Sequence, residues 1–117
     1  MLILKFLNSF KYAYLGLKQV FSEEQNFRVH TFSAIIVILL SMFVFHFSYI
    51  ELAITLICIV LVLITEIINT VIENSWDHIE PNHHPVVKSV KDMMAGAVML
   101  VSTFSAIVWI LLIFGKY

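Results

Sequence analysis

Apolar residues dominate three long segments of the chain, at 31–47, 52–77 and 93–114, and polar segments separate them. Each apolar segment is long enough for a helix to cross a bilayer. The first two are joined by the short stretch SYIE, in which Ser48 and Glu51 have the spacing of a capping box. The pattern therefore predicts three transmembrane helices, the second of which starts directly after this turn.

Residues 5–21 have a different pattern, with apolar and polar positions on opposite faces of a helix at about 100° per residue. The apolar face consists of Phe6, Phe10, Ala13, Tyr14, Leu17, Val20 and Phe21, and the polar face of Lys5, Asn8, Lys11, Tyr12, Lys18 and Gln19. Such a helix lies in the membrane interface and turns its lysines toward anionic headgroups. We expect an interfacial helix here.

Two polar segments connect these elements. Residues 22–30, SEEQNFRVH, are expected to form a hinge before the first span. Residues 78–90 are expected to form a loop, because Pro81 and Pro85 break helices. The predicted fold is an all-α integral membrane protein with a single domain over residues 1–117.

Composition supports a lipid environment. Of the 117 residues, 61% are apolar and 13% are charged, and the mean hydropathy is +0.96; soluble domains have about a quarter charged residues. The net charge of −1 argues against a nucleic-acid-binding surface. Cys58 lies within an apolar segment, where we expect it to serve packing. The N-terminal segment lacks a small-residue cleavage site, so no cleavable signal peptide is expected.

Basic residues predict the orientation. They lie before the first span and in the second loop, whereas the turn between the first two spans has none; they are Lys5, Lys11, Lys18, Arg28, Lys88 and Lys91. The positive-inside rule then places the N-terminus and the 78–92 region in the cytosol and the C-terminus outside. Small residues in the third span, and the little volume that three spans enclose, favour a homo-oligomer.

Four polar side chains interrupt the second span on one side. At about 100° per residue, Glu66, Asn69, Glu73 and Asp77 fall within an arc of about 80°. We call these four residues the acidic stripe. Because like charges at this spacing repel, the stripe predicts a cation or a basic partner, for which the candidates are Lys88, Lys91 and Arg28.

Glu66 is the strongest functional candidate. Asp77 alone, near a helix end, would be structural in roughly half of cases. Glu66 is followed by apolar residues and so lies within the membrane, where an ionisable group marks a functional site by default. It is a candidate proton acceptor. Glu73 and Glu24 carry oxygen ligands suited to Mg²⁺, which usually binds one or two carboxylates and the phosphates of a substrate.

Lys91 and Asp92 are expected to open the third helix at the cytosolic face, where free backbone N–H groups and a lysine hold phosphate. On position alone, an equal alternative is that Lys88 and Lys91 only fix the orientation; their proximity to the acidic stripe favours the phosphate site. His78, His83 and His84 match no zinc spacing and are expected in a solvated loop. His30 and His46 are expected near the membrane boundaries.

The segments NFRVH, EIINTVIENSWD and HHPVVKSVKDMMAGAV together resemble the prokaryotic diacylglycerol kinase family, and the resemblance covers nearly the whole chain. It implies a bacterial plasma-membrane enzyme that uses ATP and Mg²⁺ to phosphorylate a lipid hydroxyl. It also implies a homotrimer whose active sites are shared between neighbouring subunits.

Matched to the family position by position, Glu66 resembles the general base and Asn69 an active-site asparagine. Glu24 and Glu73 resemble the metal ligands, with Glu23 as a rival for Glu24. Arg28 is expected, with Glu66 and Asn69, at the lipid substrate. The expected nucleotide contacts are Lys5, Tyr12, Glu24, Glu73, Asp77, Asn82, His83, His84, Lys91 and Asp92. Lys5 stands where better-known members have arginine, which weakens a bidentate contact there.

NFRVH and HHPVVKSVKD look like the branch of the family that phosphorylates undecaprenol, which is the predicted substrate; diacylglycerol is the alternative. A proton-coupled transporter with Glu66 as carrier is a different class, but its carboxylate should lie near the bilayer midplane. Counted from Leu52, Glu66 lies roughly 20 Å along the span, toward the cytosolic side. A structural assembly subunit would leave the acidic stripe unexplained.

Overall fold

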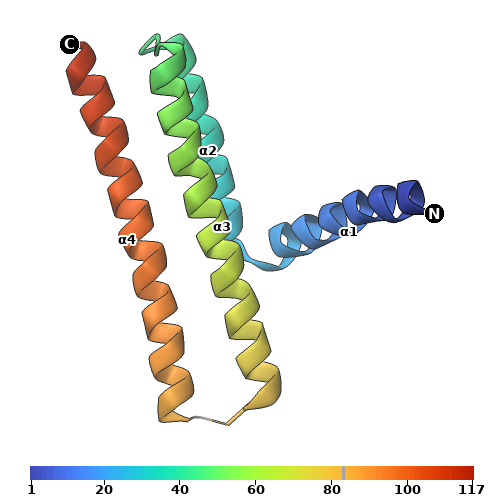
Figure 1. The fold of residues 1–117 in the computed structure, drawn as a ribbon. Coiled ribbons are helices and arrows are strands. Elements are labelled where there is room, and N and C mark those ends of the chain that lie inside the picture. Colours follow the sequence, from blue (N-terminus) through green and yellow to red (C-terminus); the bar gives the residue numbers. More distant parts are fainter. Residues whose placement is uncertain (83) are drawn as a thin grey trace.

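The computed structural model describes residues 1–82 and 84–117, and four helices make up nearly all of this part of the chain (Figure 1). They are α1 (Leu2–Glu23), α2 (Gln25–Phe43), α3 (Tyr49–Ile79) and α4 (Pro85–Lys116). By length and composition α2, α3 and α4 can each cross a membrane. The prediction of an all-helical chain with three long apolar helices is confirmed.

The three long helices run antiparallel to their chain neighbours, and α3 packs against both α2 and α4 (Figure 1). At its N-terminus α3 has the predicted capping box: the Ser48 backbone N–H donates to Glu51 at 2.8 Å, and the Glu51 N–H donates to Ser48 Oγ at 3.2 Å. The two ends of the bundle are the turn between α2 and α3, beside the C-terminus, and the connection between α3 and α4.

α1 projects sideways from the bundle, and it joins α2 through Glu24 alone (Figure 1). Glu24 has an extended backbone, with φ −107° and ψ 110°, which ends one helix and allows the next to start in a new direction. No residue of α1 is buried, so the rest of the chain leaves most of its apolar face exposed. The position of α1 in a membrane interface stays a prediction.

The predicted hinge at 22–30 is too long, because only Glu24 is non-helical and helix continues on both sides of it. α2 begins at Gln25 rather than at residue 31. Phe27 in its first turn is 7% exposed, and burial of this ring favours helix over an open hinge. α2 also ends at Phe43 rather than at residue 47, since the chain reverses through His46, whose φ is 50°.

The predicted loop at 78–90 is also too long. α3 continues to Ile79, and α4 begins at Pro85 rather than at residue 93. Pro85 occupies the first turn of α4, where a missing N–H breaks no helical hydrogen bond. His84 caps this end by accepting from the Val86 N–H at 3.1 Å. Pro85 therefore starts a helix where the sequence pattern predicts a break.

The buried part of the bundle is small and partly polar. Its apolar members are Phe27, Phe47, Cys58, Val62 and Val87. Ser41 is fully buried: its Oγ donates to the Val37 carbonyl at 2.7 Å and accepts from Trp109 Nε1 at 2.8 Å. This hydrogen bond ties α2 to α4 near the turn between α2 and α3.

Replacing Ser41 with alanine should lower the free energy of unfolding by about 1–3 kcal/mol, because the Trp109 N–H would lose its acceptor. The measurement is equilibrium unfolding of the purified protein in detergent. Ser33→Ala, at an exposed position of the same helix, is the matched control and should change stability by less than about 0.5 kcal/mol. Equal stability of the two variants would contradict a stabilising role for this bond.

Candidate functional site

The acidic stripe passes from buried to exposed along α3. Glu66 is 2% exposed and Asn69 is 8% exposed, whereas Glu73 is half-buried and Asp77 is exposed. The Asn69 Oδ1 atom is buried and has no hydrogen-bond partner among the described residues. Buried polar atoms are almost always paired, so this oxygen is available to a ligand.

The length of α3 exceeds the thickness of the hydrocarbon core of a bilayer. At 1.5 Å per residue its 31 residues extend about 46 Å, whereas the hydrocarbon core is about 30 Å thick. If α3 enters the bilayer at Tyr49, Glu66 lies about 26 Å along the helix and Asp77 lies beyond the core. A carboxylate at this depth disagrees with the transporter alternative, which needs one near the midplane.

Two further residues approach Glu66 from outside α3. His30 of α2 places its Nε2 atom 3.9 Å from Glu66 Oε2. The charges that act most strongly on Glu66 are those of His30, Glu73 and Glu24. Glu24 lies at the junction of α1 and α2, and its pairing with Glu73 at a metal ion stays a prediction.

The sequence pattern puts His30 near a membrane boundary and does not predict its contact with Glu66. A usable signal is present in the spacing. Phe27, His30, Ala34, Val37 and Ser41 follow one another at intervals of three and four, which places them on one face of a helix. The pattern is recognised only when residues 25–30 are included in the helix, and the prediction of a hinge over 22–30 excludes them.

Of the three basic candidates for the stripe, only Lys91 contacts one of its residues, because its ammonium pairs with Asp77. Lys88 instead pairs with Asp92 at 2.7 Å within α4. Arg28 donates to the carbonyls of Phe21 and Ser22, each at 2.8 Å, at the end of α1. Within the single chain Lys88 and Arg28 therefore do not pair with the stripe; Arg28 instead satisfies carbonyls at a helix end.

Lys91 and Asp92 do not open a helix. α4 begins at Pro85, so the backbone N–H groups of these two residues lie inside the helix and bond within it. The predicted phosphate site made from free N–H groups beside Lys91 is therefore wrong. What remains for an anion is the Lys91 ammonium, whose side chain is 33% exposed.

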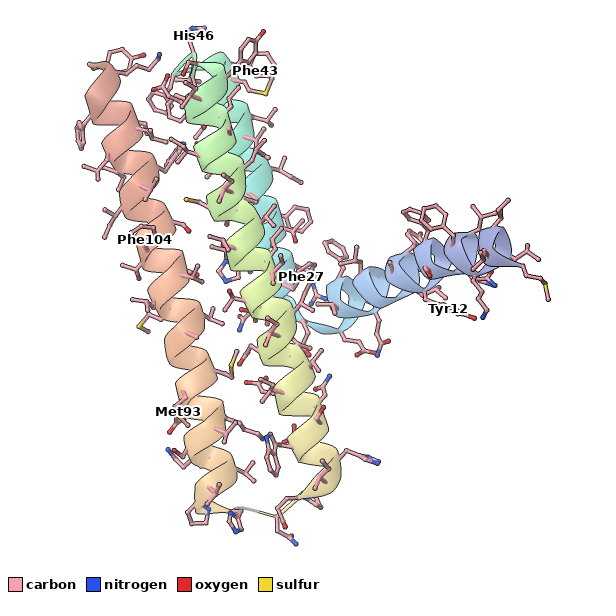
Figure 2. The ribbon with its side chains drawn as sticks, in the orientation of Figure 1. Tyr12, Phe27, Phe43, His46, Met93 and Phe104 are labelled. Carbon is pink, nitrogen blue, oxygen red and sulfur yellow. The ribbon has the colours of Figure 1, made fainter. Side chains whose placement is uncertain are left out.

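A polar cleft of about 340 Å³ lies at the connection between α3 and α4. It brings together five of the predicted nucleotide contacts, which are Asp77, Asn82, His84, Lys91 and Asp92. His83 lies outside the described residues. Lys5 and Tyr12 are exposed on α1, and Figure 2 shows Tyr12 away from this end of the bundle. Within a single chain, α1 therefore contributes nothing to the cleft.

The carboxylates of the site are candidate ligands for a divalent cation. Among residues 1–82 and 84–117, no group of three or more His, Cys, Asp or Glu side chains is arranged to hold a metal ion alone. Glu24 and Glu73 remain the predicted ligands, two carboxylates rather than the three or more side chains that would hold a metal alone. Oxygen donors of this number suit Mg²⁺, which takes its other ligands from water and phosphate. The residues present fit a metal that arrives with a nucleotide.

The chain is similar in sequence to known membrane lipid kinases. The profile of the family described as prokaryotic diacylglycerol kinase matches residues 11–113. A diacylglycerol kinase of Synechocystis sp. is 36% identical over 87% of this chain, and the match spans 58% of that protein's length. An undecaprenol kinase of Bacillus subtilis is 34% identical over 96% of this chain and 90% of its own. A diacylglycerol kinase of Haemophilus influenzae is 32% identical over 88% of this chain and 86% of its own.

Proposed function

Because the chain belongs to the prokaryotic diacylglycerol kinase family, and is thus an ATP-dependent lipid kinase of the membrane, we propose that its substrate is undecaprenol. The relative named undecaprenol kinase matches more of this chain, 96%, than the two named diacylglycerol kinases. The observation that carries the proposed site is the buried Glu66 carboxylate on a stripe that leads to a polar cleft. Diacylglycerol remains the alternative substrate, since two relatives carry that name.

In the proposed reaction Glu66 accepts the proton of the lipid hydroxyl. The hydroxyl oxygen then forms a bond to the γ-phosphorus of ATP, the bond from that phosphorus to the β,γ-bridging oxygen breaks, and ADP leaves. A base at the bilayer boundary suits a hydroxyl whose tail stays in lipid, because the hydroxyl can reach the base without leaving the membrane. Asn69, on the same face of α3, would donate from its side-chain amide N–H to the oxygen of this hydroxyl.

We propose that Glu24 and Glu73 hold the Mg²⁺ that accompanies ATP. When bound, Mg²⁺ neutralises phosphate charge. The cleft between α3 and α4 would take the nucleotide, with Lys91 as the phosphate contact and Asp77, Asn82, His84 and Asp92 around it. In an isolated subunit Lys91 pairs with Asp77, so phosphate would compete with that carboxylate for the ammonium.

A homotrimer would explain two features of the single chain. The buried core is small, and α4 contributes only Val87 to it among the described residues. Lys5 and Tyr12 are exposed on a helix that projects from the bundle, so they can act at the site of a neighbouring subunit. We propose a bacterial plasma-membrane trimer with shared sites, its N-terminus in the cytosol and its C-terminus outside.

Lys91→Ala should raise the KM for ATP about tenfold, which corresponds to about 1.4 kcal/mol of lost binding. Stability should change by no more than about 1 kcal/mol, because the pair with Asp77 is solvent-exposed. Lys116→Ala is the matched control, since Lys116 pairs with Glu51 at 3.3 Å at the opposite end of the bundle. An unchanged KM for ATP in Lys91→Ala would remove Lys91 from the nucleotide site.

The proposed substrate is tested by giving the purified protein γ-labelled ATP, Mg²⁺ and equal amounts of undecaprenol and diacylglycerol in mixed micelles. The two lipid phosphates are then separated and counted. Preferential labelling of undecaprenol supports the proposal. Preferential labelling of diacylglycerol would leave the lipid kinase assignment intact and overturn the substrate.

A further inference from the structure

His30 contacts the carboxylate on which the proposed function depends, although it belongs to another helix. Its Nε2 atom lies 3.9 Å from Oε2 of Glu66. In the part of the chain that the structure describes, no other basic side chain comes within 4.0 Å of that carboxylate. A distance of 3.9 Å is too long for a hydrogen bond and short enough for an ion pair.

The two members of this pair are unequally buried. The Glu66 side chain is 2% exposed and the His30 side chain is 27% exposed. An interaction at a buried carboxylate is screened less than one between exposed groups. The pair therefore has more influence on Glu66 than surface pairs such as Lys88 with Asp92 have on their partners.

His30 also lines an apolar cleft of about 310 Å³ between α2, α3 and α4. Ala34 and Val37 of α2 and Val62 of α3 line the same cleft, whereas Glu66 does not. The imidazole thus lies where the apolar cleft meets the buried carboxylate. A group at this place can fix how the carboxylate is presented.

Neighbouring basic residues are engaged elsewhere. Arg28, two positions before His30, uses its guanidinium on the carbonyls of Phe21 and Ser22. Lys91 pairs with Asp77, further along α3. His30 is the basic side chain that remains beside Glu66.

Resting on the proposed role of Glu66 as the base, we propose that His30 is a positioning residue, which holds the Glu66 carboxylate in the orientation that accepts the lipid hydroxyl's proton. A glutamate side chain has freely rotating bonds, and catalysis needs a base held close to its productive geometry. An imidazole on an adjacent packed helix supplies that restraint through its Nε2 atom. His30 acts through Glu66 and touches no reacting atom.

The test compares His30→Asn with His30→Lys. Asparagine keeps a polar group near the position of Nδ1 but lacks Nε2, so kcat should fall about 10- to 100-fold while the KM values for ATP and lipid stay within about twofold. Lysine restores a cation within reach of Glu66 and should recover at least about half of the lost rate on a logarithmic scale. A merely structural role would lower thermal stability in both variants and would give no recovery with lysine.

His46→Asn is the matched control, because His46 lies in the turn that follows α2, far along the chain from His30, and its φ of 50° suits asparagine. Its kinetics should equal those of the unchanged protein. If the unchanged protein labels no lipid alcohol, the proposed function fails. If it is active and Glu66→Gln is inactive, but His30→Asn keeps full kcat or His30→Lys is as slow as His30→Asn, only the role of His30 is overturned.

Discussion

Replacing Glu66 with glutamine should lower the rate of lipid phosphorylation by about 10²–10⁴-fold, because an amide cannot accept the proton of the lipid hydroxyl. Glutamine has nearly the shape of glutamate, so packing around this 2% exposed side chain should be kept. The measurement is the initial rate of label transfer from γ-labelled ATP to the lipid, with size-exclusion chromatography in detergent to check assembly.

Glu51→Gln gives the matched control for this change. Glu51 lies at the opposite end of the same helix, where its side chain accepts from the Ser48 N–H, a role that the glutamine amide oxygen can also serve. We expect this variant to keep its rate within about twofold of the unchanged protein. Unchanged turnover in Glu66→Gln would remove Glu66 from the role of base.

Replacing Glu73 with glutamine should raise the Mg²⁺ concentration for half-maximal rate by about tenfold or more, since a neutral oxygen binds Mg²⁺ more weakly than a carboxylate. Glu24→Gln should have the same effect, because Glu24 is the second proposed ligand of the ion. The measurement is a Mg²⁺ titration of the rate at saturating ATP. High Mg²⁺ should restore part of the rate in both variants.

Glu23→Gln separates the two neighbouring glutamates at the end of α1. Glu23 is exposed and lies within α1, whereas Glu24 is partly buried at the junction with α2. Its Mg²⁺ titration should overlay that of the unchanged protein. A shifted titration in Glu23→Gln with a normal one in Glu24→Gln would exchange their roles, and a normal titration in Glu73→Gln would exclude Glu73 as a ligand.

The helices and the residues that share a helix face could be predicted from the sequence, because they depend on local spacing. Three apolar segments gave three long helices, and Ser48 with Glu51 gave the capping box that starts α3. The acidic stripe was visible because helical spacing alone decides which residues share a face. The gradient of burial along it, from Glu66 to Asp77, also follows from the apolar residues around its inner end.

Helix ends were less predictable, because polar residues and proline occur both in loops and in the first turn of a helix. Polar residues at 25–30 favour a loop in a soluble protein, but here they extend α2, since Phe27 is buried against the bundle. Pro85 breaks a helix in its interior and favours one at its first turn. Local composition does not distinguish these cases; tertiary packing does.

Contacts between helices could not be predicted, because one sequence gives no relative rotation of its helices. Lys91 is one of the predicted candidate partners of the stripe, and it pairs with Asp77. Its place inside α4, and not at the start of a helix, depends on where α4 begins, which the sequence pattern does not predict. His30 was missed for the same reason. Once α2 includes residues 25–30, His30 faces α3 and reaches Glu66.

The position of the lipid hydroxyl can be measured with a lipid alcohol that carries a photoreactive diazirine beside its hydroxyl. Irradiation in the presence of Mg²⁺ and a non-hydrolysable ATP analogue, followed by mass spectrometry of the peptides, gives the residues that the hydroxyl end approaches. If the proton acceptor is Glu66, adducts should concentrate on residues 62–73 of α3 and around His30. Adducts confined to the opposite half of the bundle, near Tyr49 or Trp109, would contradict it.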